Sequence, residues 1–388
     1  MLATVGCLVP AFLVSGAGAV ASPGWLVEAT PNPADATASV LSGVSCPSRE
    51  ACTAVGHFTS RAGAGVLLAE RFDGTRWSIE SIRKPLGART SLLFDVSCAS
   101  PAACTAVGSV TDRSGLTVPL VERRNRSRWS VQRTPQVGSS SQGVSYLGGV
   151  SCASSRDCVA VGFSGNATGT VGTPLAERWN GAGWRVESTP LPAEARVGFL
   201  SAVSCTSPRS CVAVGFLISR VGTGEPLAER WNGTRWSIER TPSPEAAVET
   251  QLVGVSCARQ GSCMAVGFFN IVTGIRVMMA EHLSGMRWSL QRDRYPPGAT
   301  GVQFAGVSCP SAGACTAVGY FGDIDGYDDP LAERWDGMRW ATQPLPSPGG
   351  ALSSSLASVS CSSNWACTAV GTSLDARGTE VTFAERYS

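Results

Sequence analysis

The most distinctive group of reactive side chains lies in one loop, where aspartates alternate around Gly326. Its carboxylates are Asp323, Asp325 and Asp328, and its phenols are Tyr320 and Tyr327. Several carboxylate oxygens in one short loop could satisfy a hard cation, so the three aspartates are candidate calcium ligands. The full twelve-residue calcium pattern and its terminal glutamate are absent, which leaves a plain acidic turn as the alternative.

These five residues are also the candidate ligand-binding residues. Paired carboxylates can perform acid/base chemistry on polysaccharides, in which case the chain would be a hydrolase or a lyase. That chemistry needs groups that face each other across a cleft, whereas these aspartates cluster in one loop. The sequence therefore favours binding over turnover, and no residue is assigned a catalytic role.

A second set of carboxylates recurs along the chain, each followed by an arginine except in the fifth copy, where His282 follows. These glutamates are Glu70, Glu122, Glu177, Glu229, Glu281, Glu333 and Glu385. A catalytic carboxylate needs one special environment, so seven equivalent positions indicate a scaffold role. Charges inside a strand are rarely buried unless paired, so we expect salt bridges or backbone hydrogen bonds that tie strands together.

Fourteen of the fifteen cysteines form seven pairs with the spacing C-x5-C, and Cys7 is the exception. The pairs are Cys46/Cys52, Cys98/Cys104, Cys152/Cys158, Cys205/Cys211, Cys257/Cys263, Cys309/Cys315 and Cys361/Cys367. Structural zinc sites favour shorter spacings, and the chain has only two histidines. A short turn between two strands would bring facing cysteines to bonding distance, so we predict disulfides, which persist in an oxidising compartment.

The elements that hold these residues repeat, with successive cysteine pairs starting 52 to 54 residues apart. In the first copy the expected strands are 41–46, 52–56, 67–72 and 77–80. The Asp73-Gly74 dipeptide between the last two is a strong hairpin signal, and Asn-Gly or Asp-Gly recurs there in later copies. No stretch shows the periodicity of an amphipathic helix. Four antiparallel strands per copy predict an all-β protein with the β-propeller architecture.

The two ends of the sequence complement each other. The last copy stops after its third strand at Tyr387, and residues 24–30 match the missing fourth strand. Pairing of 24–30 with 381–387 would close a ring of seven blades and cover both end strands. We therefore expect a single seven-bladed domain over 22–388, with blades at 41–82, 93–134, 147–189, 200–241, 252–293, 304–345 and 356–387, the last completed by 24–30.

The Ala-Val-Gly strand, the Ala-Glu-Arg-Trp-Asn-Gly stretch and the tryptophan three residues later resemble kelch-type blades. The repeat also looks like that of secreted actinobacterial propeller proteins of unassigned function. The single glycine and the cysteine pair depart from the kelch pattern. Copper-radical oxidases that share the kelch-type ring need two histidine ligands, but His57 and His282 lie at different repeat positions, so no cofactor other than calcium is expected.

Residues 2–21 carry no charge and end in an Ala-Val-Ala sequence, so residues 1–21 are predicted to be a signal peptide. Together with the disulfides, this predicts a secreted or cell-surface protein. No later stretch is long and apolar enough to span a membrane. A net charge of +2 without a clustered basic face argues against nucleic-acid binding. We expect a monomer that binds a carbohydrate or a protein.

Function is expected where the copies differ. The loops between the second and third strands vary most and share one rim with the loops between copies. On that rim the second strand is followed by His57, Phe163, Phe216, Phe268 or Tyr320. Asp95 replaces a small residue beside the axis and is expected to be a solvated charge in the channel. The predicted function is a binding module for a glycan, a cell-wall polymer or a protein.

Overall fold

The computed structural model describes residues 24–137, 143–291 and 295–388, which consist of strands and turns without a helix. The all-β class predicted from the sequence is therefore confirmed. The predicted signal peptide at residues 1–21 lies outside the described residues. Within the described ranges, no helix is long and apolar enough to cross a membrane.

The strands form seven four-stranded antiparallel units, which we number 1 to 7 in chain order. Unit 1 contains β2 (Ala36–Ser48), β3 (Ala51–Ser60), β4 (Gly65–Phe72) and β5 (Trp77–Ile79). Unit 2 contains β6 (Ala88–Ser100), β7 (Ala103–Asp112), β8 (Thr117–Asn125) and β9 (Arg128–Val131). Unit 3 contains β10 (Val144–Ser154), β11 (Asp157–Gly165), β12 (Gly172–Trp179) and β13 (Trp184–Glu187). Unit 4 contains β14 (Ala195–Ser207), β15 (Ser210–Ser219), β16 (Gly224–Trp231) and β17 (Trp236–Glu239). Unit 5 contains β18 (Ala247–Arg259), β19 (Ser262–Ile271), β20 (Arg276–Ser284) and β21 (Arg287–Gln291). Unit 6 contains β22 (Gly301–Ser311), β23 (Ala314–Gly322), β24 (Asp328–Trp335) and β25 (Trp340–Thr342). Unit 7 contains β26 (Ser353–Ser363), β27 (Ala366–Leu374), β28 (Glu380–Tyr387) and β1 (Trp25–Ala29).

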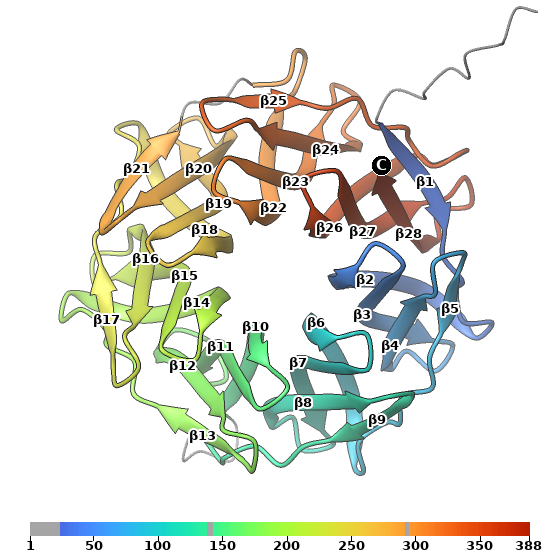
Figure 1. Ribbon diagram of the computed structural model, residues 1–388, viewed down its shortest axis with the longest axis horizontal. Coiled ribbons are helices and arrows are strands. Elements are labelled where there is room, and N and C mark those ends of the chain that lie inside the picture. The colour runs from blue at the N-terminus through green and yellow to red at the C-terminus, as the bar shows by residue number, and fades with distance from the viewer. Residues whose placement is uncertain (1–23, 138–142, 292–294) are drawn as a thin grey trace, which may run out of the picture.

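The units stand around a central opening, with the first strand of each unit innermost (Figure 1). Single parallel bridges join units 2 to 5 into one 16-stranded sheet. β1 pairs with β28, from Trp25 opposite Tyr387 to Ala29 opposite Phe383. The first and last strands of the described chain therefore lie side by side (Figure 1).

The strands are longer than the sequence pattern predicted. β2 begins at Ala36 and β3 continues to Ser60, because residues 36–40 remain paired with 57–60 beyond the apolar core. The variable segment between the second and third strands of unit 1 is therefore mostly an extended hairpin with a turn at 61–64. Side chains near such turns are held by paired strands.

A serine before each first-strand cysteine joins neighbouring units. Its Oγ accepts a hydrogen bond of 2.9 or 3.0 Å from the backbone N–H of the matching cysteine in the next unit. The pairs are Ser45–Cys98, Ser97–Cys152, Ser151–Cys205, Ser204–Cys257, Ser256–Cys309, Ser308–Cys361 and Ser360–Cys46. The seven predicted disulfides are all present, each across the hairpin of the first two strands.

The innermost strands of all seven units line an axial cavity of about 260 Å³. Asp95 lies on this lining, where its Oδ1 accepts the N–H of Val96 and its Oδ2 accepts the N–H of Val150, both at 2.8 Å. Burial raises the pKa of Asp95 to about 7, against the effect of these hydrogen bonds. Its carboxyl is thus a half-buried bridge between units 2 and 3, not the solvated charge that the sequence predicted.

The third-strand glutamates differ from the sequence prediction. All seven are buried, and, leaving Glu333 aside, none forms an ion pair within the described ranges. Consecutive residues of a strand point to opposite faces, so Glu177 faces the packed interior while Arg178 does not. Burial raises the pKa of Glu177 to about 8. The salt bridges predicted for the six glutamates other than Glu333 are therefore wrong.

Other acidic residues form the ion pairs. Arg178 lies 2.9 Å from Asp157, and Arg230 pairs with Glu239 on the fourth strand of its own unit. Glu239 also accepts a 3.0 Å hydrogen bond from the indole N–H of Trp288 in the next unit. A fourth-strand glutamate thus connects an arginine of its own unit to the buried tryptophan of its neighbour.

Candidate functional site

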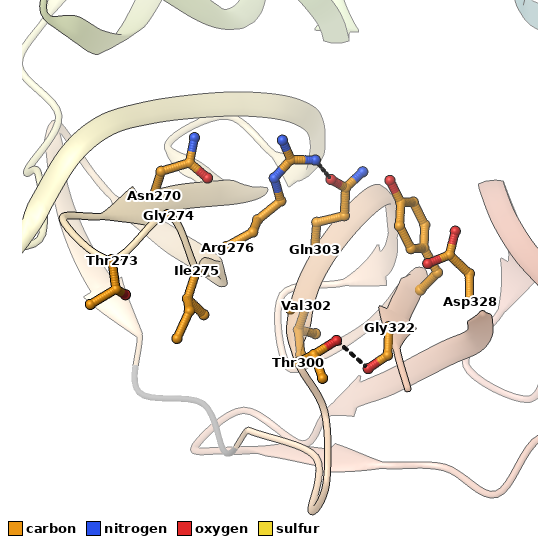
Figure 2. A pocket seen from close by; sticks show the side chains of 12 residues that line it. Asn270, Thr273, Gly274, Ile275, Arg276, Thr300, Val302, Gln303, Gly322 and Asp328 are labelled. Atoms are coloured by element: carbon orange, nitrogen blue, oxygen red, sulfur yellow. Dashed lines mark hydrogen bonds between the residues drawn. The ribbon is translucent and has the colours of Figure 1, made fainter. Parts of the chain in front are cut away.

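A cavity of about 450 Å³ opens between units 5 and 6, beside the turn that joins β19 to β20 (Figure 2). Its walls come from β19 and β20 on one side, and from β22, β23 and the first residue of β24 on the other. Its larger polar side chains are Asn270, Arg276, Thr300, Gln303, Tyr320 and Asp328. The cavity is therefore concave and mostly polar, and its walls come from these strands and from the turn at 273–275.

Arg276 and Asp328 occupy the same repeat position in successive units, five residues before the buried third-strand glutamate. In units 1 to 7 that position holds Gly65, Thr117, Gly172, Gly224, Arg276, Asp328 and Glu380. Three of the seven units have glycine there, whereas the two units that form the cavity have opposite charges. The cavity thus forms where the repeat departs from its usual small residue.

Comparison with unit 3 explains why space opens in unit 6. In unit 3 the ring of Phe163 lies against Gly172, so a Cβ added to that glycine would come within 2.4 Å of the ring. Tyr320 and Asp328 are the matching residues of unit 6. In unit 6 the position of that glycine carries the Asp328 side chain, and both Asp328 and Tyr320 line the cavity.

The guanidinium group of Arg276 is held from two directions. It donates a hydrogen bond to Oε1 of Gln303, drawn as a dashed line in Figure 2, and its Cζ lies 4.2 Å from the ring centroid of Phe268. Stacking on an aromatic face and a hydrogen bond in the guanidinium plane restrict the orientation of the group. Two contacts therefore hold the Arg276 side chain at the cavity.

Burial and charge shift the pKa of both acidic groups in the cavity. Burial raises the pKa of Tyr320 and so does the charge of Asp328, while Arg276 opposes both effects. Burial also raises the pKa of Asp328, with smaller contributions from the charges of Asp323 and Asp329. At neutral pH the cavity thus presents a phenol that can donate or accept a hydrogen bond and a carboxyl group in a partly desolvated setting.

The cavity unites two of the five candidate ligand-binding residues, Tyr320 and Asp328, and leaves the other three outside. Asp323 accepts backbone hydrogen bonds at Oδ1 from the N–H groups of Asp325 and Tyr327, both at 2.9 Å. Asp325 and Tyr327 are exposed on the turn between β23 and β24. Asp323 therefore stabilises the turn beside the cavity.

The calcium hypothesis is not supported by this geometry. Among residues 24–137, 143–291 and 295–388, no group of three or more His, Cys, Asp or Glu side chains could hold a metal ion. Asp112 and Asp375 accept the same pair of backbone hydrogen bonds in the equivalent turns of units 2 and 7. Asp323 thus repeats a turn role that needs no cation.

The other rim aromatics are mainly packing residues. Phe163 and Phe216 both stack on Phe199, with ring centroids 4.4 and 4.7 Å apart, and Phe268 lies beneath Arg276. His57 is half-buried, and burial lowers its pKa. Of this group, Tyr320 lines the cavity.

Sequence reasoning missed Arg276, Gln303 and Asn270. A signal for Arg276 was present, because the residue five positions before each third-strand glutamate changes from glycine to charge in unit 5. Gln303 lies opposite Tyr320 in the β22–β23 register, where unit 3 has Tyr146 opposite Phe163. Position-by-position comparison of the copies would have drawn attention to both residues.

No family model matches this chain, and no curated protein matches it. Among solved structures, it is similar to the GH74 xyloglucanase from Xanthomonas campestris, with 13% identity and a TM-score of 0.52 over 93% of this chain. The chain spans 55% of the length of that enzyme. An ulvan lyase of polysaccharide lyase family 25 matches with 10% identity and a TM-score of 0.52, over 90% of this chain and 94% of the lyase.

These likenesses establish the fold class, a β-propeller, which confirms that part of the sequence prediction. At such low identity they establish the fold alone. The kelch-type resemblance and the actinobacterial source are not tested by these matches and stay predictions.

Proposed function

We propose that this chain is a seven-bladed β-propeller, closed by β1 and β28, that binds carbohydrate outside the cell. The β1–β28 pairing and the hydrogen bond from Cys46 to Ser360 support closure, since each joins the two ends of the chain. Seven disulfides support an oxidising, extracellular location. Each unit is then one blade of the ring.

The observation that carries the binding proposal is the cavity between units 5 and 6. Its volume of about 450 Å³ lies within the range of small-ligand sites. A pyranose has hydroxyl groups around its edge and apolar C–H faces. Tyr320 offers a ring with a polar tip, and Asn270, Gln303 and Asp328 offer hydrogen-bonding groups for hydroxyls.

Polysaccharide turnover is the alternative. The two fold neighbours are named for polysaccharide-cleaving activities, and for this reason we consider turnover as the alternative. Hydrolysis uses two carboxyl groups on opposite sides of the scissile bond, roughly 5 to 10 Å apart. Asp328 is the single carboxylate among the described residues that line the cavity. The cavity therefore supports binding better than hydrolysis.

A glycan array followed by titration calorimetry tests the proposal. We expect the wild-type protein to bind a defined set of saccharides and Asp328→Asn to weaken that binding by about tenfold, the loss of one charge-assisted hydrogen bond. Glu380→Gln is the matched control, because Glu380 holds the same repeat position in unit 7 but lies outside the cavity. The control is expected to bind as the wild type does.

Product analysis on the same saccharides separates binding from turnover. Release of shorter saccharides that Asp328→Asn abolishes would favour the enzyme over the binding module. Failure of the wild-type protein to bind any saccharide on the array would contradict the proposed function altogether.

A further inference from the structure

Two opposite charges share one cavity without neutralising each other. Arg276 and Asp328 both line it, yet neither belongs to an ion pair within the described ranges. Gln303 lies between them in Figure 2, and it accepts a hydrogen bond from the arginine. The arrangement keeps a cation at one side of the cavity and a carboxylate at the other.

Arg276 differs from the arginines of the repeat. Several of those are already paired with an acidic residue, as in Arg178 with Asp157 and Arg386 with Glu28. Arg276 instead rests on Phe268 and donates to the neutral Gln303, so its positive charge has no carboxylate partner in the described chain. A planar guanidinium held in this way presents further N–H donors in a geometry that matches a carboxylate.

We propose that the ligand is an acidic saccharide, in which a uronate carboxylate binds Arg276 while a ring hydroxyl donates to Asp328 and the sugar packs beside Tyr320. This inference rests on the proposed function of the cavity. A neutral sugar would remove water from the arginine without supplying a countercharge, which costs free energy.

The acidic turn beside the cavity limits how much negative charge the ligand carries. Asp323, Asp325, Asp328 and Asp329 all lie on or next to that turn, against one arginine in the cavity. A densely sulfated chain would be repelled by these carboxylates, whereas a uronate places a single charge on Arg276. A uronic acid unit within an otherwise uncharged glycan fits this balance best.

The test compares uronate-containing oligosaccharides with their carboxyl-reduced counterparts, in which each –COO⁻ is replaced by –CH2OH at unchanged linkage. By titration calorimetry we expect the wild-type protein to bind the acidic form at least about tenfold more tightly, and Arg276→Gln to remove that preference. Arg113→Gln is the matched control, since Arg113 lies exposed in the equivalent turn of unit 2. Melting temperatures check that all variants fold.

The outcomes separate the two proposals. Equal binding of acidic and reduced forms, with loss in Asp328→Asn, would contradict the uronate inference and leave carbohydrate binding in place. An acid preference that survives in Arg276→Gln would also overturn the inference. Absence of binding to every saccharide of either form would overturn both proposals.

Discussion

The third-strand glutamates differ most from the sequence prediction, because the folded protein buries their carboxyl groups. Glu177 is 0% exposed, and neither of its carboxylate oxygens has a hydrogen-bond partner in the described chain. Burial raises the pKa of five of the seven to about 8: Glu70, Glu177, Glu229, Glu281 and Glu385. A carboxyl group with such a pKa is mostly protonated at neutral pH, so these five glutamates are mainly neutral acids.

The stability of the fold should therefore fall as the pH rises. Because the folded pKa of about 8 exceeds the reference value of 4.5, the contribution is fully present below pH 4.5 and is lost as pH rises through 8. We expect the melting temperature to drop between pH 6 and pH 9, and to drop less in Glu177→Gln, which has no proton to lose. Calorimetric scans across this range would reveal it; parallel curves for the two proteins would contradict it.

Glu177→Ala separates packing from titration. It removes buried side-chain atoms and leaves a cavity, so it should lower the melting temperature at every pH. A melting temperature equal to that of the wild type would show that the glutamate has no structural role.

The burial of the third-strand glutamates and the pairing of the arginines beside them could not be predicted from residue type alone. Because charges inside a strand are rarely buried unless paired, the sequence suggested salt bridges or backbone hydrogen bonds, but Glu177 is buried without an ion pair while Arg178 pairs with Asp157. The cysteines were predictable because a disulfide constrains spacing directly. The burial of a carboxyl group depends on the neighbouring unit, which the sequence does not display.

Among the elements, the second strand of each unit depends on a glycine. In unit 3 a Cβ on Gly162 would lie 1.9 Å from the carbonyl oxygen of Tyr146, next to the register shift between Leu147 and Gly149. The close approach involves backbone atoms of the first strand, which cannot move aside as a side chain can. The glycine of the Ala-Val-Gly motif is therefore a steric requirement of a bulge.

We expect Gly162→Ala to destabilise the protein by about 3 kcal/mol, the upper range for overpacking a well-packed site. Gly183→Ala is the control within the same unit, because an added Cβ there meets nothing within 4 Å. Urea unfolding would measure both. A Gly162 variant as stable as the Gly183 variant would contradict the steric account.

The elements themselves were largely predictable, and the cavity was not. The hairpin between β4 and β5 follows from its Asp-Gly turn, and the period of the copies follows from the cysteines. Tyr320 and Asp328 were predictable because acids and phenols gather in one loop of the sequence. Arg276 was not, because it belongs to the adjacent unit, and only the packing of units 5 and 6 brings it to the same cavity as Asp328.

For the whole molecule, the proposed closure makes the stability of the last unit depend on the first strand, β1. Trp25 is buried in unit 7, with its ring 5.6 Å from that of Tyr387. We expect Trp25→Ala to lower the free energy of unfolding by about 3 to 5 kcal/mol, as for other buried aromatic residues. Leu26→Ala is the control on the same strand, because Leu26 is 65% exposed. Equal stability of the two variants would contradict a role for β1 in completing the last unit.

We propose that the cavity between units 5 and 6 holds a carbohydrate. The most direct measurement is a crystal structure of the protein soaked with the saccharide that binds best on the array. We expect density for a sugar between Arg276 and Asp328, with Tyr320 beside the ring. Density only elsewhere, for example at the axial cavity beside Asp95, would contradict it.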